Sequence, residues 1–442
     1  MKLKCNIVFC VVLMLLPGRI GAQVVQKRMM EDPKAGASIF RPYFYEEATS
    51  VSKPQSGFEL FYVSHFGRHG ARYYSHPTTW QHTVDCFDAA ERRGILTARG
   101  EELFAAIKKI HLAHEEMYGE LTPLGAVEHR QIAARMFKRA KKVFTDKSRN
   151  QVRCASSIFS RCLMSMANFT EELSSLAPEL ELSYIAGKKY NTEYLNSPLS
   201  YDINAEANVI LDSLKRANLR PDSLISLYFA DVEAAESLIS DPYAFEMGVF
   251  YFWAISYDLD FLYVDFTELV PFEELAECSA IDSATKYAKV ALSNEFGKYT
   301  RVKGVNMLKD FVAKADDALQ EDSKIAADLR FAHDSSFLPM CSLLGIEGYP
   351  SCSVVEAHEN WNAGDVVPMC SNLQMEFYRN RRGDVRVKVL VNEREVALGG
   401  LTPVDGIFYS WADVRTLIEG LDVPQLGNQH LGDKSHLNQL YE

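Results

Sequence analysis

Residues 59–72 read ELFYVSHFGRHGAR, and this stretch predicts the fold of the chain. Apart from Glu59, residues 59–63 are apolar, aromatic or β-branched, as in a buried strand. The strand is expected to end in a glycine-flanked loop that carries Arg68, His69 and Arg72. Ligands of α/β proteins bind at the carboxyl ends of strands. Two guanidinium groups beside an imidazole suit a phosphate, because arginine offers a planar fork to anion oxygens and histidine can attack phosphorus. The plainer alternative is a surface loop with ordinary charges.

Two later stretches have a similar layout. Residues 152–167 predict a short strand, a serine-rich turn and a helix that carries Arg161. The start of such a helix also favours an anion, although a solvent-exposed helix arginine is the alternative. Residues 326–336 predict a strand, a sharp polar turn and a serine-capped helix, with His333 and Asp334 in the turn.

These motifs resemble those of the histidine phosphatase superfamily. Residues 68–72 match the Arg-His-Gly-x-Arg signature of its acid phosphatase and phytase branch. Arg161 and Ser165 match a second motif, in which an arginine is followed four residues later by a serine. His333-Asp334 resembles the His-Asp element of the family, and residues 121–125 resemble the start of its Leu-Thr-x-x-Gly helix. Thr122-Pro123 is itself a typical helix start, with a capping threonine followed by proline at the first helical position. The resemblance spans about residues 57–420.

The chain also departs from the family pattern. The family usually has a proline two residues after the second arginine, where residues 73–76 read YYSH. Residues 121–167 resemble the multiple inositol polyphosphate phosphatases, but those proteins carry His-Ala-Glu where this chain has His333-Asp334. The absence of the proline is expected to affect the substrate pocket more than the catalytic chemistry.

The resemblance implies a catalytic mechanism. His69 would attack the phosphoryl group and form a phosphohistidine, and Asp334 would give a proton to the leaving oxygen. The groups implied to hold the phosphate oxygens are Arg68, Arg72, Arg161 and His333. Their positive charge stabilises the transition state, so neither a metal nor another cofactor is expected.

The substrate implied is a small phosphomonoester. Ser75 and His76 follow the first motif and are candidates for the substrate pocket, and Lys188 and Lys189 are candidates for an outer phosphate. A general acid phosphatase is expected, with a phytase or inositol polyphosphate phosphatase as the alternative. A catalytically silent phosphate-ester binding protein is a second alternative, although such a relic would usually have lost His69 or the proton donor.

The expected fold is α/β: a mixed, mostly parallel sheet flanked by helices, with a phosphoglycerate mutase-like core and a helical cap. The core is expected to contain residues 23–187 and 321–442, and the mainly helical insertion residues 188–320. Residues 358–360 are interpreted as loop. Strand alternation at 372–378 and 385–391 predicts a hairpin.

The N-terminus predicts export. A basic start, an apolar run and small residues near position 22 are typical of a signal peptide over residues 1–22, so we expect a periplasmic or secreted protein. No later stretch is long enough for a membrane span, and stable membrane insertion is not expected. The formal net charge of -12 argues against nucleic acid as a partner. Disulfides are permitted; Cys341–Cys352 and Cys352–Cys370 are both plausible.

Overall fold

The computed structural model describes residues 22–47, 51–199 and 201–423. Apart from Ala22, the predicted signal peptide lies outside these residues. One sheet has the strand order β3-β2-β4-β1-β5-β6-β7, with β8 paired to β6. The strands are β1 Glu59–Arg68, β2 Gln151–Ser156, β3 Glu181–Ile185, β4 Ile325–Ala332, β5 Asn372–Arg379, β6 Val385–Val391, β7 Arg394–Glu395 and β8 Tyr409–Ser410. The expectation of a mixed, mostly parallel sheet is confirmed, since β1 to β4 are parallel and the predicted β5–β6 hairpin is antiparallel.

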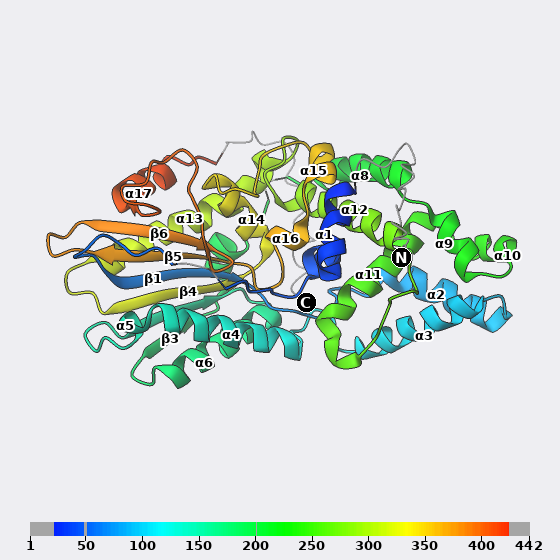
Figure 1. The fold of residues 1–442 in the computed structure, drawn as a ribbon, viewed down its shortest axis with the longest axis horizontal. Coiled ribbons are helices and arrows are strands. Elements are labelled where there is room, and N and C mark those ends of the chain that lie inside the picture. The colour runs from blue at the N-terminus through cyan, green and yellow to red at the C-terminus, as the bar shows by residue number, and fades with distance from the viewer. Residues whose placement is uncertain (1–21, 48–50, 200, 424–442) are drawn as a thin grey trace, which may run out of the picture.

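Helices cover both faces of the sheet (Figure 1). One face carries α13 Gly297–Leu319, α14 Asp334–Leu343 and α17 Trp411–Glu419, and the other carries α4 Pro123–Arg139, α5 Lys141–Phe144 and α6 Ser160–Leu176. Under α4 and α6, residues such as Ile132, Phe169 and Leu329 form one buried apolar cluster. Because helices pack on both faces, β1 is buried from Tyr62 to Arg68.

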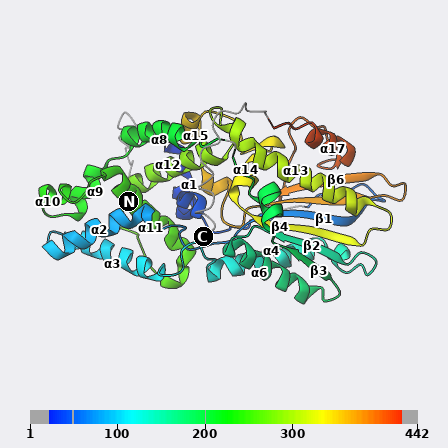
Figure 2. The same ribbon diagram turned by 180° about the vertical axis from the view of Figure 1, so that it is seen from behind.

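The rest of the molecule is a helical half beside the end of the sheet (Figures 1 and 2). Its segments are α1 Gln23–Glu31, η1 Pro33–Phe40, α2 Thr78–Arg93, α3 Ala98–Ala113, α8 Asn204–Asn218, α9 Pro221–Tyr228, α10 Val232–Glu236, α11 Pro242–Ser256, η3 Tyr257–Leu262 and α12 Phe272–Val290. Aromatic residues form its core: the Trp80 and Phe252 rings stack with centroids 4.2 Å apart. Helices α2 and α3 precede the predicted insertion 188–320 in the sequence yet pack in this half. The domain boundaries drawn from the sequence stay a prediction.

The structure differs from three local predictions. Strand β1 continues to Arg68 because it is paired on both sides. Its pairing with β4 reaches Arg68, and its pairing with β5 reaches Gly67. Residues 358–360 are the end of a helix, α15 Val354–Asn360, which begins at a capping box formed by Ser353 and Glu356. Helix α14 is not capped by a serine; His333 occupies the cap position.

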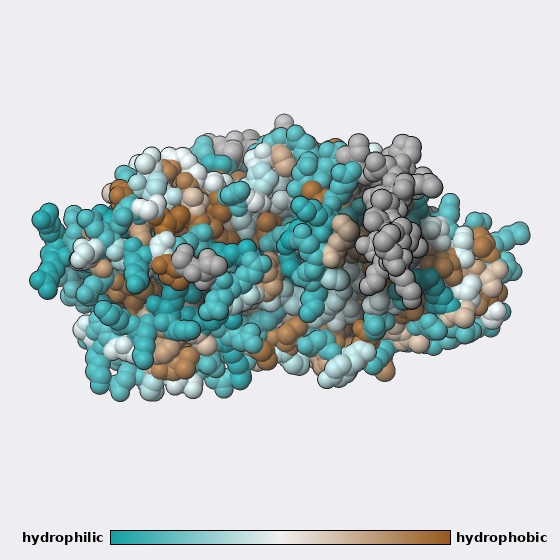
Figure 3. Space-filling model, in the orientation of Figure 1, coloured by the Kyte–Doolittle hydropathy of each residue, from teal (hydrophilic) through white to brown (hydrophobic). Residues whose placement is uncertain are grey.

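The described surface is mainly polar. Figure 3 shows hydrophilic residues over most of one face, with hydrophobic residues in small separate groups. No helix among the described residues is long and apolar enough to cross a membrane. The seven cysteines of the described ranges are free thiols, so neither expected disulfide is formed in the structure.

Candidate active site

The first sequence motif, residues 68–72, begins where the central strand β1 ends. The Arg68 N–H donates to Ser371 O at 2.7 Å, and the His69 N–H donates to Ala332 O at 2.9 Å. The His69 carbonyl accepts from Cys370 N at 3.0 Å. Backbone bonds on both sides therefore fix His69 at the carboxyl ends of the parallel strands, the usual ligand edge of such a sheet.

The start of helix α4 lies directly against the loop that follows His69. The Thr122 side chain caps this helix by accepting from Gly125 N, as its sequence predicts. A Cβ on Gly125 would lie 2.3 Å from Ala71 O, and one on Gly70 would lie 2.7 Å from Gly125 O. The two backbones approach so closely that only glycine fits at both positions.

Two side chains hold the N–H groups of this loop. Glu128 on α4 accepts from Ala71 N at 2.9 Å and from Tyr43 N at 2.6 Å. The Ser165 hydroxyl accepts from Gly70 N at 3.1 Å and donates to Arg161 O at 2.7 Å. The spacing of Arg161 and Ser165 thus has a structural reason: one turn of α6 delivers both an arginine and a loop anchor.

The His69 ring is set up as a nucleophile. Its Nδ1 lies 3.0 Å from Gly70 O. A carbonyl oxygen can only accept, so Nδ1 carries the proton and Nε2 keeps its lone pair. Burial, followed by the charges of Arg161, Arg68 and Arg72, holds the pKa of His69 well below its usual value. The imidazole is therefore neutral, as attack on phosphorus requires.

Three arginines surround this ring. Arg68 is buried and its Nη1 donates to Ile39 O and Val367 O at 2.9 and 2.7 Å. Burial, with Arg161 and Arg68 nearby, lowers the pKa of Arg72 to about 10. The Nε–H groups of Arg68, Arg72 and Arg161 are buried without a hydrogen-bond partner among the described residues. Buried donors without partners carry a free-energy penalty that an anion would remove.

His333 lies on the other side of His69, with ring centroids 5.7 Å apart. The Ser157 hydroxyl donates to Asn191 Oδ1 at 2.7 Å and lies 3.1 Å from His333 Nε2. Since that hydroxyl has only one proton, it accepts from Nε2–H of His333. Burial and then Arg161 lower the pKa of His333 well below its usual value.

Asp334 is the first residue of α14 and faces an unexpected partner. Its Oδ2 lies 2.9 Å from Lys286 Nζ and 3.7 Å from Arg68 Nη2. Burial acts to raise the pKa of Asp334, but Lys286 and Arg68 outweigh it and hold that pKa far below its usual range. Asp334 is therefore a carboxylate in the ligand-free site.

A cavity of about 200 Å³ opens beside these residues. Arg72, Ser75 and His76 line one part, and Lys286 and Lys289 of α12 line another. The structure thus brings Ser75 and His76 to the site, as predicted. Lys188 and Lys189 lie exposed on the short helix α7 Lys188–Tyr190 and line neither this cavity nor the next one.

A second hollow, of about 330 Å³, continues from the first and shares Thr79, Thr285 and Lys289 with it. Its lining includes Lys215 and Arg216 of α8. Carboxylates also line the two cavities: Asp282 lines the first, and Asp212, which lies 3.1 Å from Lys215 Nζ, and Asp241 line the second. Four cations, Lys286, Lys289, Lys215 and Arg216, thus extend outward from Arg72 along α12 and α8 beside these carboxylates.

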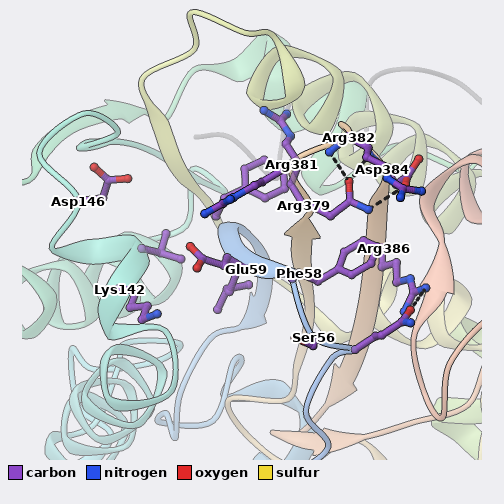
Figure 4. A pocket seen from close by; sticks show the side chains of 16 residues that line it. Ser56, Phe58, Glu59, Lys142, Asp146, Arg379, Arg381, Arg382, Asp384 and Arg386 are labelled. Atoms are coloured by element: carbon purple, nitrogen blue, oxygen red, sulfur yellow. Dashed lines mark hydrogen bonds between the residues drawn. The ribbon is translucent and has the colours of Figure 1, made fainter.

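A larger hollow of about 1090 Å³ lies at the opposite end of the sheet (Figure 4). It is lined by the start of β1 and the β5–β6 turn, where arginines such as Arg381 and Arg382 mix with Glu59, Asp146 and Asp384. None of the motif residues lines it. Arg72 of the first motif lines the smaller cavity instead, so the candidate chemistry is assigned to that end of the sheet.

The motifs did not reveal Lys286 and Lys289. Both lie on α12, which is otherwise largely buried and carries no catalytic signature. Positions 282, 285, 286 and 289 all line the cavity and follow helical spacing. The sequence signal that could have pointed to Lys286 and Lys289 was a stripe of polar residues on a mostly buried helix. Such a stripe does not indicate which site it faces.

Comparison with known proteins agrees with this geometry. The sequence pattern described as the histidine phosphatase superfamily (branch 2) matches residues 252–392. The structure of the Bifidobacterium longum multiple inositol polyphosphate phosphatase in complex with inositol hexasulfate is similar, with a TM-score of 0.72 and 18% identity over 89% of this chain and 99% of that one. The resemblance to the histidine phosphatase superfamily is confirmed.

The D. castellii phytase is also similar, with a TM-score of 0.63 and 14% identity over 87% of this chain and 84% of that one. A search of curated proteins found no match. In this histidine phosphatase fold the three motifs predicted from the sequence follow β1, β2 and β4, which are adjacent in the sheet. The order of the strands thus explains why distant motifs form one site.

Proposed function

We propose that this chain is an exported phosphomonoester hydrolase that forms a phosphohistidine on His69. One observation carries the proposal: a buried, neutral imidazole, with its proton fixed on Nδ1, lies among three arginines whose Nε–H groups find no hydrogen-bond partner within the described part of the chain. A phosphate would satisfy those donors and present phosphorus to Nε2. Export rests on the composition of residues 1–22.

In the first step, His69 Nε2 forms a bond to phosphorus while the ester P–O bond breaks. Arg68, Arg72 and Arg161 neutralise the charge on the non-bridging oxygens. His333, whose Nε2–H bonds to Ser157, can donate to them only from Nδ1 after taking up a proton. This preorganised charge stabilises the transition state without reorganisation of solvent. Asp334 in its protonated form gives its proton to the leaving oxygen.

In the second step, Asp334 acts as a base. Its carboxylate takes a proton from water, the water oxygen bonds to phosphorus, and the His69 N–P bond breaks to release inorganic phosphate. Because Asp334 must alternate between acid and base, its pKa in the complex governs turnover. Acidic pH favours the first step.

The cavities favour an inositol polyphosphate over a simple phosphomonoester. A general acid phosphatase needs one phosphate site, whereas Lys286, Lys289, Lys215 and Arg216 line a path outward from that site. Further phosphates of one substrate would meet these cations. The similar structures named as phytase and inositol polyphosphate phosphatase support the same substrate class.

Phosphate release tests the proposal. Native protein and the His69→Ala variant are assayed on an aryl phosphate and on inositol hexakisphosphate between about pH 4 and pH 8, a range that spans carboxyl and imidazole titration. We expect release that disappears in His69→Ala, with the hexakisphosphate preferred. No release from either substrate would favour the catalytically silent phosphate-ester binding protein.

A further inference from the structure

The ion pair between Lys286 and Asp334 opposes the step that Asp334 must perform. A proton donor has to carry a proton, yet Lys286 Nζ at 2.9 Å and Arg68 Nη2 at 3.7 Å stabilise the carboxylate. Arg68 is held in place by two backbone carbonyls. Within residues 22–47, 51–199 and 201–423, Lys286 makes no such bond to a backbone carbonyl, and its side chain is 20% exposed. Of the two cations, Lys286 is the one free to move.

The other charges around Asp334 do not remove this conflict. The titratable and charged groups that face it are Lys286 and Asp282 of α12, Arg68 of β1, Arg161 and Cys162 of α6, Lys303 of α13 and the adjacent His333. Asp282 is the one carboxylate in this set. Lys303 is half-buried and donates to Asn196 Oδ1 at 2.9 Å. A change in ionisation at Asp334 therefore has to come from a ligand.

The cavity brings such a ligand to Lys286. Lys286 and Lys289 are three residues apart on α12 and line the same wall. Lys289 also lines the outer hollow together with Lys215. Burial, and then the positive charges of Lys215 and Lys286, lower the pKa of Lys289, and Asp202 and Asp212 offset this only in part. A second phosphate between Lys286 and Lys289 would relieve this repulsion.

We propose that a second phosphate of the substrate draws Lys286 away from Asp334 and so frees Asp334 to act as the acid. Lys286 is then a positioning residue that couples substrate charge to proton transfer, and this role rests on the function proposed above. Asp334 takes a proton from solvent when Lys286 leaves. That proton passes to the leaving oxygen as the P–O bond breaks and the His69 N–P bond forms. A substrate with a single phosphate leaves Lys286 on Asp334 and turns over slowly unless its leaving group needs no proton.

Proton uptake on binding tests this coupling. Inositol hexasulfate and inorganic sulfate stay ionised near pH 5, so proton exchange on binding reports the protein. Calorimetry in two buffers of different ionisation enthalpy measures it. We expect hexasulfate to cause up to about one proton more uptake per site than sulfate, because Asp334 acquires a proton. The excess should vanish in Asp334→Asn and in Lys286→Met, in which the pair is already broken.

Two matched variants distinguish the coupling between Lys286 and Asp334 from a general effect of positive charge on ligand binding. Lys286→Arg keeps the cation and should retain the excess uptake. Lys289→Met removes the neighbouring lysine, which does not contact Asp334, and should weaken hexasulfate binding while uptake at saturation remains. Equal uptake with both ligands, or an excess that persists in Lys286→Met, would overturn the proposal.

Kinetics supply a second readout. In Lys286→Met, kcat for an alkyl monophosphate near pH 5 should rise, and the preference for the hexakisphosphate should fall by about tenfold, as one unit of pKa at Asp334 implies. A fall in kcat for both substrates would instead assign Lys286 a simple binding or structural role. If native protein releases no phosphate in a His69-dependent way from either an aryl phosphate or the hexakisphosphate, the proposed function fails and this inference fails with it.

Discussion

Replacement of Gly125 by alanine should damage the site without touching any charged residue. The new Cβ would lie 2.3 Å from Ala71 O and 2.8 Å from Ala71 N, where an ordinary contact begins near 3.4 Å. Relief requires the start of α4 and the His69 loop to separate by about 1 Å. Ala71 resists this movement because its carbonyl accepts from Thr122 N and its N–H donates to Glu128.

The expected cost follows from this geometry. Overpacking of this kind lowers the free energy of unfolding by about 1–3 kcal/mol. A displacement of about 1 Å at a nucleophile costs about a hundredfold in rate. We therefore expect kcat/KM for an aryl phosphate to fall by about that factor while the protein remains folded. Steady-state kinetics and urea unfolding measure the two effects.

A matched control is available at Gly187, where a Cβ would meet nothing within 4 Å. Gly187→Ala should change neither quantity. If Gly125→Ala retains native kcat/KM and native stability, the close approach of α4 to the loop does not position His69, and the reasoning is wrong.

Three further predictions concern protonation. His114 accepts from Tyr74 N at 2.9 Å, and burial lowers its pKa to about 4 from the ordinary 6.5. Between these two pKa values the unfolded chain binds more protons than the folded chain. The free energy of unfolding should therefore fall by about 3 kcal/mol from pH 7 to pH 4 because of His114 alone. Urea unfolding of His114→Gln should show a pH dependence that is smaller by this amount. Asp334→Asn should slow alkyl phosphate esters far more than aryl phosphates; equal losses on both would exclude Asp334 as the acid. The pKa of His69 is held well below 6.5, so His69 should stay neutral from pH 7 to pH 5. Over this range kcat/KM for an aryl phosphate, corrected for substrate ionisation, should stay level. With a nucleophile of ordinary imidazole pKa, kcat/KM would fall about twentyfold.

The sequence was sufficient for the elements that depend on local pattern. Apolar runs followed by polar turns predicted β1, β2 and β4, and the Thr122-Pro123 start predicted α4. The alternation at 372–391 predicted the hairpin. These signals are local because strand alternation and helix capping involve residues close in the chain.

Other features needed the folded chain. The sequence predicted a loop from Ser64, yet pairing on both sides extends β1 to Arg68. The expected cysteine pairs are not formed, because spacing along the chain says little about distance in space. Lys188 and Lys189 were named for their charge, whereas Lys286 and Lys289 line the cavity.

The sequence by itself determined which groups could act on a phosphate: His69, the three motif arginines and the His333-Asp334 pair. It determined this because residue types and their spacing within each strand-and-turn unit are local. Only the tertiary structure decided the state of these groups, namely a neutral His69 and an Asp334 held ionised by Lys286 of another helix. Ionisation depends on burial and on charges a few ångströms away through space, and helix packing sets those distances.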